Sequence, residues 1–148
     1  MGCRVRQTDA ETEVIGPKKL VGIETDMSNL SDTAQTLAAI APFAEGPTRV
    51  TGIGFIRKKE TDRVGAVVTE LQRMGIRAEE EADGFVVWPG VPRPTDVETY
   101  DDHRMAMSFA ITGLAADGIR IRNPACVSKT FPDFFDVLAR FRGDSLGG

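Results

Sequence analysis

Apolar residues in the middle of the chain recur at the spacing of an amphipathic helix. From Val64 to Met74, valine, leucine and methionine residues lie three or four positions apart, and Gly75 closes the run. The stretch immediately before it, Lys58–Arg63, holds five charged residues among six. The pattern therefore predicts a helix whose apolar side packs on a core and whose first turn is strongly charged.

Two other predicted helices carry almost no charge. One is expected from Ser31 or Asp32, acting as its N-cap, to about Ala44, and the other covers residues 105 to about 116. A helix that is apolar on all sides is typical of a buried position. A fourth helix is expected to begin at Pro132, a residue favoured at the first helical position.

Short strands with alternating polarity are expected between these helices. They are residues 3–7, 12–15, 20–24, 48–53, 76–79, 85–88 and 119–122. The first two form a predicted hairpin, and the turn at Asp83–Gly84 predicts a second one. Residues 89–99, which are rich in proline, and residues 126–130 are expected to be connections. This alternation of strands and helices places the chain in the α/β (α+β) class.

Two parts of the chain, about 32–75 and 102–142, show the same order of elements. In each, an aspartate opens a buried helix, a strand follows, and a lysine precedes the next helix. Asp32 and Asp102 are seventy positions apart, and so are Lys59 and Lys129. We therefore predict an internal repeat with quasi-symmetric packing, which gathers the helix N-termini at one edge of a sheet.

Composition narrows the function classes. The 148 residues suffice for one domain, 41% of them are hydrophobic, and the net charge of −4 gives no overall attraction to nucleic acid or to a membrane surface. No apolar run reaches transmembrane length. Cys3, Cys126 and the single His103 have no metal-ligand spacing, so we expect no metal, two free thiols and a cytoplasmic location.

Most of the chemically versatile side chains lie at the expected helix starts. They are Asp32, Lys59, Glu60, Arg63, Asp102, His103, Arg104 and Lys129. Free N–H groups at a helix start favour phosphate or carboxylate, and arginine grips such groups bidentately. Carboxylates among the cations supply acid–base capacity. The combination predicts a site that binds a small, doubly anionic molecule and moves a proton on it.

Each of these residues also has a purely structural interpretation. Asp32 and Asp102 are typical N-caps, and His103 is equally typical of a structural hydrogen-bonding residue. The Lys58–Arg63 stretch also fits a solvated first turn with local ion pairs, and Lys129 fits an exposed loop. The spacing alone leaves these alternatives open.

Several stretches resemble the signatures of 5-enolpyruvylshikimate-3-phosphate synthase. Three of them are Lys59–Arg63 (KETDR), Asp102–Met107 (DHRMAM) and Lys129–Asp133 (KTFPD), and Ser31–Ala38 (SDTAQTLA) resembles a fourth. The likeness runs from about residue 1 to residue 141. It implies a partial C-terminal lobe of the enolpyruvyl transferase fold, with repeated βαβαββ units and buried parallel helices under four-stranded sheets.

The resemblance also implies an activity. The family transfers the enolpyruvyl group of phosphoenolpyruvate to the 5-hydroxyl of shikimate 3-phosphate and releases phosphate, with no cofactor and no metal. By the same likeness, Arg63, Arg104 and Lys129 would bind phosphoenolpyruvate.

The remaining roles follow from the same motifs. Asp32 and Lys59 would contact shikimate 3-phosphate, and Asp32 would also accept the proton of its 5-hydroxyl. Glu60 would donate a proton to the methylene carbon of phosphoenolpyruvate. His103 would tune this network.

Members of this family are much longer than this chain, and a strand that starts at residue 3 also indicates a piece of a longer protein. We expect the missing N-terminal lobe to carry the rest of both substrate sites, so that the chain alone is inactive or nearly so. Apolar surface left by the truncation is expected to cause self-association, and residues 142–148 are expected to be frayed.

Two other hypotheses remain. The first is that the chain is a non-catalytic anion-binding or assembly module. The second is that it is one half of a natural split enzyme whose other lobe is a separate chain. Retention of both Asp32 and Glu60 favours an enzyme fragment over a binding module, because binding an anion requires neither carboxylate.

Overall fold

A computed structural model describes residues 1–144 of the chain, with side chains through residue 141. Within this part, the α-helices are α1 (Ala34–Ile40), α2 (Arg63–Arg73), α3 (His103–Ala115) and α4 (Phe134–Asp144). The 3-10 helices are η1 (Ser31–Thr33), η2 (Ala41–Phe43), η3 (Gly54–Lys58) and η4 (Pro124–Lys129). The strands are β1 (Arg4–Gln7), β2 (Thr12–Ile15), β3 (Leu20–Val21), β4 (Glu24–Asp26), β5 (Ala44–Glu45), β6 (Thr48–Thr51), β7 (Ala78–Glu81), β8 (Gly84–Val87), β9 (Thr95–Val97) and β10 (Ile119–Ile121).

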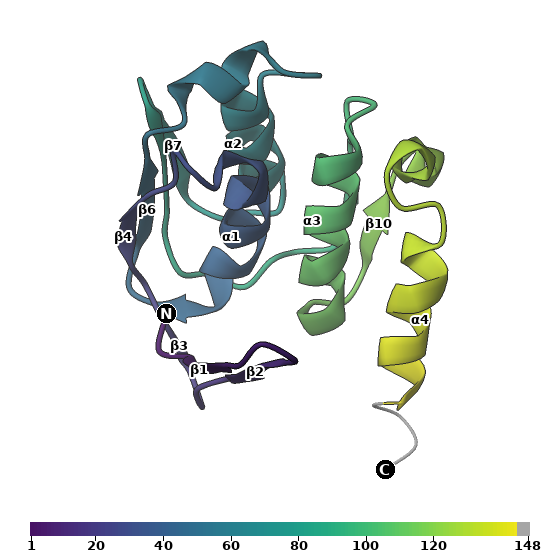
Figure 1. Ribbon diagram of the computed structural model, residues 1–148. Coiled ribbons are helices and arrows are strands. Elements are labelled where there is room, and N and C mark those ends of the chain that lie inside the picture. The colour runs from purple at the N-terminus through teal and green to yellow at the C-terminus, as the bar shows by residue number, and fades with distance from the viewer. Residues whose placement is uncertain (145–148) are drawn as a thin grey trace.

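The main sheet has the strand order β4-β6-β8-β7 and covers one side of helices α1 and α2 (Figure 1). Strands β4 and β6 are parallel, while β6–β8 and β8–β7 are antiparallel. Val50 on β6 and its register partner Phe85 on β8 are fully buried, whereas Arg49, the residue before Val50, is exposed and pairs with Glu24 and Glu81. The alternation of buried and exposed residues along β6 therefore directs one face of this sheet into the core.

Helices α1 and α3 run parallel in direct contact, with small residues between them. Thr36 and Ser108 join their hydroxyl oxygens at 3.1 Å, and one turn further the Thr112 hydroxyl donates to the carbonyl of Ala39 at 2.9 Å. The two contacts advance along both helices together, so both helices start at the same edge of the molecule. Fully buried alanines such as Ala38 permit this close approach.

The first helix begins differently from the prediction. Residues Ser31–Thr33 form the 3-10 turn η1, and neither Ser31 nor Asp32 provides a side-chain cap. The Thr33 hydroxyl instead donates to the carbonyl of Leu30 at 2.8 Å. The N-cap prediction for Ser31 or Asp32 is therefore wrong, and the Asp32 carboxylate is directed to other partners.

Other predicted boundaries need correction. The strand expected at residues 20–24 is two strands in different sheets, because Leu20–Val21 pairs with β5 and Glu24–Asp26 pairs with β6. At Gly22, between them, a Cβ atom would lie 2.3 Å from the Pro47 carbonyl oxygen. The connection expected at residues 89–99 contains strand β9, which pairs with β10 in parallel. The predicted loop at residues 126–130 lies largely within η4.

The last helix also differs from the prediction. Helix α4 begins at Phe134, two residues after the expected Pro132, and continues to Asp144. The expected frayed end therefore starts inside a helix, and residues 145–148 lie outside the described part of the chain.

The elements follow one another in the same order twice. The series β4–α1–β6–η3–α2 is matched by the series β9–α3–β10–η4–α4, and in each series the two strands are parallel neighbours. The repeat itself, over about 32–75 and 102–142, stays a prediction. Among the described residues, however, the second series has a two-stranded sheet, where the prediction implied four strands. None of the helices in residues 1–144 is long and apolar enough to span a membrane.

Candidate active site

Arg63, the first residue of helix α2, lies at the centre of a charged cluster. Its guanidinium donates twice to Asp102, from Nε at 2.7 Å and from Nη2 at 3.3 Å. It also donates from Nη1 to Asp32 at 3.1 Å and from Nη2 to Glu60 at 2.8 Å. Only 2% of the Arg63 side chain is exposed, so burial strengthens these contacts relative to a surface pair.

Asp102 joins this arginine to the start of helix α3. Its carboxylate is fully buried and accepts the backbone N–H of Arg104 at 2.8 Å, which caps the helix as predicted. The same carboxylate holds the Arg63 guanidinium. Asp102 is therefore both a helix cap and the counter-ion that fixes the orientation of Arg63.

Asp32 bridges two arginines at the start of α1. Its Oδ1 accepts from Arg63, and its Oδ2 accepts from Nη2 of Arg104 at 2.9 Å. Arg104 also donates from Nη1 to the Asp32 carbonyl at 3.0 Å. The parallel alignment of α1 and α3 produces this contact, since Asp32 lies in η1, just before α1, and Arg104 lies in the first turn of α3.

Glu60 bridges Arg63 and Lys129 in the same way. Its Oε2 accepts from Arg63, and its Oε1 accepts from the Lys129 ammonium at 3.4 Å. The break between η3 and α2 carries Glu60, while η4 ends at Lys129, so the two residues come from corresponding places in the two series of elements. Cations and carboxylates thus alternate through the whole cluster.

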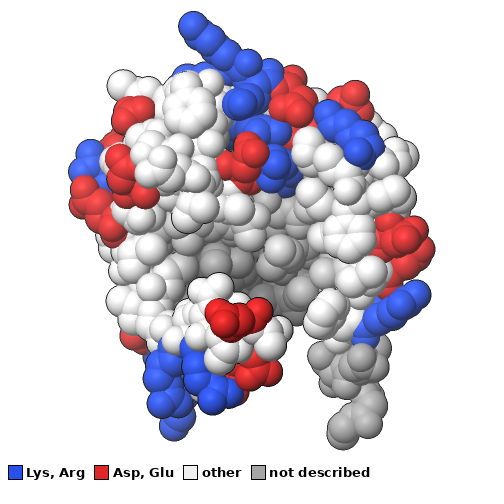
Figure 2. Space-filling model, viewed as in Figure 1, with Lys and Arg blue, Asp and Glu red and all other residues white. Residues whose placement is uncertain are grey.

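Lys59 differs from the other predicted site residues. It is exposed, and its backbone N–H donates to the Ile56 carbonyl at 3.3 Å, while its side chain takes no part in the cluster formed by its neighbours. Figure 2 shows Lys and Arg side chains interleaved with Asp and Glu side chains along the upper edge of the molecule, over the helix starts seen in Figure 1.

The local environment keeps Glu60 ionised. Its pKa lies below the usual value, chiefly because its own backbone N–H donates to the carboxylate, and also because Arg63 and Lys129 lie beside it. Partial burial opposes this change. If Arg63 or Lys129 binds another anion in place of Glu60, the pKa of Glu60 will rise and its carboxylate will take up a proton more readily.

His103 is buried behind the cluster. Its Nδ1 has no hydrogen-bond partner among the described residues and lies 3.9 Å from Oδ1 of Asp102. Burial lowers the pKa of the imidazole, and Lys129 and Arg104 lower it further, while Asp102 and Glu60 act in the opposite direction. The imidazole is therefore neutral at pH 7.

This histidine should make stability depend on pH. Below about pH 6.5 the unfolded chain protonates its imidazole while the folded chain does not, so the free energy of unfolding falls until the lower folded pKa is reached. We expect a decrease of at most about 1.4 kcal/mol per pH unit, beginning at about pH 6.5 and ending where the folded imidazole also takes up its proton. Urea unfolding at several pH values measures it. Because the chain has one histidine, His103→Asn should remove this slope, and a slope that persists would contradict the assignment.

The sequence did not reveal what fixes η3, the element just before Glu60. Arg57 on η3 donates to Asp62 at 2.9 Å and to Glu80 at 2.8 Å, and the Asp83 carboxylate accepts the backbone N–H groups of Gly52 and Gly54. These contacts tie η3 to the β7–β8 hairpin. The Asp83–Gly84 pair was recognisable only as a turn, because its partners lie about thirty positions away.

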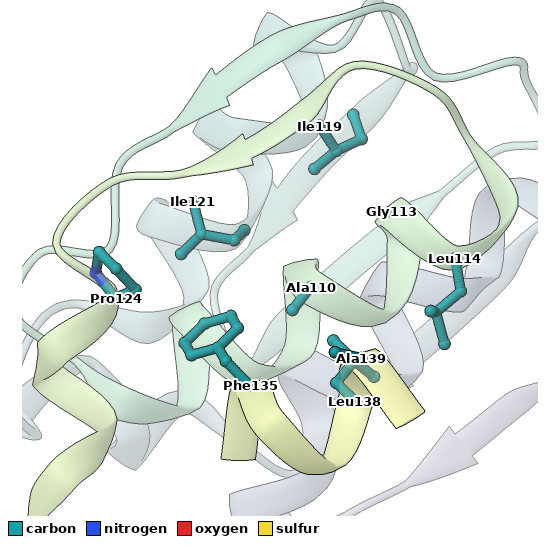
Figure 3. A pocket seen from close by; sticks show the side chains of 9 residues that line it. All are labelled: Ala110, Gly113, Leu114, Ile119, Ile121, Pro124, Phe135, Leu138 and Ala139. Carbon is teal, nitrogen blue, oxygen red and sulfur yellow. The ribbon is translucent and has the colours of Figure 1, made fainter. Parts of the chain in front are cut away.

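A separate apolar pocket lies between α3, β10 and α4, with a volume of about 500 Å3 (Figure 3). Leu114, Ile121 and Phe135 are among its lining residues, and none of the described side chains that line it is charged. It does not suit a doubly anionic ligand. Within the described residues, no group of three or more histidine, cysteine or acidic side chains is arranged to hold a metal ion.

Comparisons with known proteins agree with the motifs. Residues 1–138 match the family model described as EPSP synthase (3-phosphoshikimate 1-carboxyvinyltransferase). The chain is 55% identical over 135 residues to the 3-phosphoshikimate 1-carboxyvinyltransferase of Nostoc punctiforme, a match that covers 91% of this chain and 32% of that protein.

Solved structures extend the comparison to three dimensions. EPSP synthase from Acinetobacter baumannii matches with a TM-score of 0.79 and 28% identity, over 95% of this chain and 36% of that chain. The enolpyruvyl transferase NikO from Streptomyces tendae matches with a TM-score of 0.74 and 27% identity, over 95% and 32%. The chain thus spans about a third of the length of the curated relatives it matches.

Proposed function

Because the chain belongs to the EPSP synthase family, and its fold matches part of the solved structures of that family, we propose that it supplies part of an enolpyruvyl transferase active site. The reaction joins the enolpyruvyl group of phosphoenolpyruvate to the 5-hydroxyl of shikimate 3-phosphate. One observation carries this proposal: Asp32 and Glu60 each bridge two cations of a single cluster. The cations that would bind the substrate anions are thus in direct contact with the carboxylates that would transfer protons.

Substrate anions would compete with these carboxylates for the same donors. Arg104 and Lys129 are partly exposed, with 30% and 50% of their side chains accessible, and can exchange a carboxylate for a phosphate or carboxylate group of phosphoenolpyruvate. Arg63 would stay anchored through Nε by buried Asp102, and its Nη atoms would turn to the ligand when Asp32 and Glu60 release them. Lys59, exposed beside Glu60, would reach the more distant shikimate 3-phosphate.

The exchange of partners supplies the proton chemistry. When the phosphate of phosphoenolpyruvate takes over Arg63 and Lys129, Glu60 loses two of the groups that lower its pKa, while its own backbone N–H remains, so the carboxylate takes up a proton from solvent more readily. It then donates this proton to the methylene carbon, which leaves C2 electron-deficient. The 5-hydroxyl adds to C2 and gives its proton to Asp32, forming a tetrahedral intermediate.

Elimination completes the transfer. A proton leaves the new methyl group for a carboxylate, the electron pair forms the enol double bond, and the bond from C2 to the phosphate oxygen breaks. The cations that bind the phosphate stabilise the charge that develops on it. Neutral His103, buried beside Asp102, would tune this network without carrying a full charge.

The remaining part of the active site would come from chain that this sequence does not include. Exposed apolar residues on the β1–β2 hairpin, such as Val5 and Val14, are consistent with a face that another lobe covers. We infer that the chain alone is inactive or nearly so, and that this face promotes self-association. A non-catalytic anion-binding module is the alternative, favoured only by the exposed cations.

Phosphate release from phosphoenolpyruvate and shikimate 3-phosphate tests this proposal. The chain is assayed alone and after mixing with the part of the Nostoc punctiforme relative that it does not cover. We expect release only in the mixture. Release by the chain alone would contradict the need for a second lobe. No release from a mixture whose components are folded and associated, by circular dichroism and light scattering, would favour the binding module.

A further inference from the structure

A buried carboxylate outside the charged cluster contacts the turn that precedes helix α3. Glu70 on α2 is fully buried, and its oxygens accept the Tyr100 hydroxyl at 2.8 Å and the backbone N–H of Glu98 at 3.1 Å. Arg73, one turn further along α2, donates to both oxygens at 2.9 and 2.8 Å. Helix α2 is thus joined to residues 98–100 by a network with no other evident task in the site.

The turn that Glu70 holds has an uncommon backbone conformation. Tyr100 and Asp101 both have φ of 56°, in the left-handed region that residues with a Cβ seldom occupy. Such conformations are unfavourable and persist only where surrounding contacts enforce them. Asn123, just before η4, supplies a second contact by donating from Nδ2 to Asp101 at 3.0 Å. The turn is therefore held by Glu70 through Tyr100 and by Asn123 through Asp101.

The residue that follows this turn is Asp102. Its carboxylate orients the Arg63 guanidinium and caps the helix that carries Arg104. Its backbone N–H donates to the Thr99 carbonyl at 2.8 Å, within the same turn. A relaxation of the turn would move Asp102, and with it the two arginines that face the anion.

We propose that Glu70 and Tyr100 are positioning residues of the charged cluster, which hold the Tyr100–Asp101 turn in its left-handed conformation and thereby set the placement of Asp102, Arg63 and Arg104. The proposal rests on the proposed function only in that the cluster receives a substrate anion. Neither residue contacts the cluster directly. Their effect is transmitted through the turn.

The protonation states suit this role. Burial and the hydrogen bond to Glu70 raise the pKa of Tyr100 to about 12, so the phenol remains a donor throughout the working pH range. Arg73 compensates the buried Glu70 charge, and this pair leaves the carboxylate free to accept from the turn. Replacement of Tyr100 by phenylalanine removes one hydroxyl and keeps the ring.

The test compares the wild-type chain with Tyr100→Phe by NMR, using inorganic phosphate as the anion probe. We expect faster amide exchange at residues 99–104 and a His103 pKa displaced upward, because a looser turn admits water to the imidazole that Asp102, Glu60, Arg104 and Lys129 surround. Phosphate affinity should fall by about threefold to tenfold, the effect of one hydrogen bond. Glu79→Gln, an exposed carboxylate paired with Arg77, is the matched control and should change none of these.

The readouts separate this proposal from the proposed function. An unchanged His103 titration together with unchanged amide exchange at residues 99–104 in Tyr100→Phe would overturn the positioning role. Loss of global stability alone speeds exchange at core amides throughout the chain and leaves the titration of the folded protein unchanged, so only faster exchange confined to residues 99–104 supports the role. Failure of the wild-type chain to bind phosphate would count against the proposed anion site, while the titration and exchange still decide the role of Tyr100. Glu70→Gln provides a second variant and should displace the same signals in the same direction.

Discussion

Arg63→Met should lower the free energy of unfolding by about 3–5 kcal/mol, the range measured when one partner of a buried ion pair is removed. Arg63 is almost completely buried, and Asp102, its main partner, is fully buried. Methionine keeps much of the apolar volume but leaves the Asp102 carboxylate without its cation in a site from which water is excluded. Urea denaturation of the purified chain measures the change.

Two variants make the result specific. Arg104→Met removes an arginine of the same cluster whose partner Asp32 is half exposed, so the expected loss is about 0–1 kcal/mol. Adding Asp102→Asn to Arg63→Met removes the orphaned charge and should recover part of the stability. Equal losses for Arg63→Met and Arg104→Met would show that burial does not dominate the cluster.

Glu60→Gln should reduce phosphate release by the reconstituted enzyme about 10²–10⁴-fold, the usual contribution of a positioned acid or base. Glutamine keeps the shape of the side chain and can still accept a hydrogen bond from Arg63, but it cannot donate a proton to carbon. Affinity for phosphoenolpyruvate should change little, because the cations that bind it remain. Initial rates at saturating substrate, with binding measured separately, distinguish the two effects.

The control for this variant is Glu45→Gln, which changes an exposed carboxylate on β5 that pairs with Lys19 far from the cluster. It should leave phosphate release unchanged. If Glu60→Gln retains full activity, Glu60 is not the proton donor, and the assignment would pass to Asp32. If affinity falls as steeply as the rate, Glu60 serves to arrange the cations instead.

Several elements could be predicted from interactions between residues that are close in the sequence. The apolar spacing from Val64 to Met74 correctly predicted helix α2, because one buried stripe at helical period requires no knowledge of its partner. The Asp83–Gly84 turn correctly predicted the β7–β8 hairpin, and Asp102 was correctly expected to cap α3. The motifs also indicated the family, which the comparisons confirm. In each case the determining residues are neighbours in the sequence.

Contacts between residues distant in sequence decided the features that could not be predicted, such as the partners of Asp32 and the strands at residues 20–24. Aspartate is a residue type that is favoured at helix caps, yet Asp32 bridges Arg63 and Arg104. It does so because parallel packing of α1 and α3 brings the starts of the two helices together. The segment at residues 20–24 has the pattern of one strand, yet its two ends pair with different strands, β5 and β6, and so belong to two sheets.

The amino-acid sequence by itself determined which side chains are available and which helices and hairpins form, since those depend on interactions within a few residues. The tertiary structure decided which charges meet, which are buried and which stay outside, as Lys59 does. It also decided the left-handed turn at Tyr100 and Asp101, which no local preference predicts and which the buried Glu70 helps to hold. The physical reason is that burial and long-range pairing set the energies of charged groups, and neither is encoded in a short stretch of sequence.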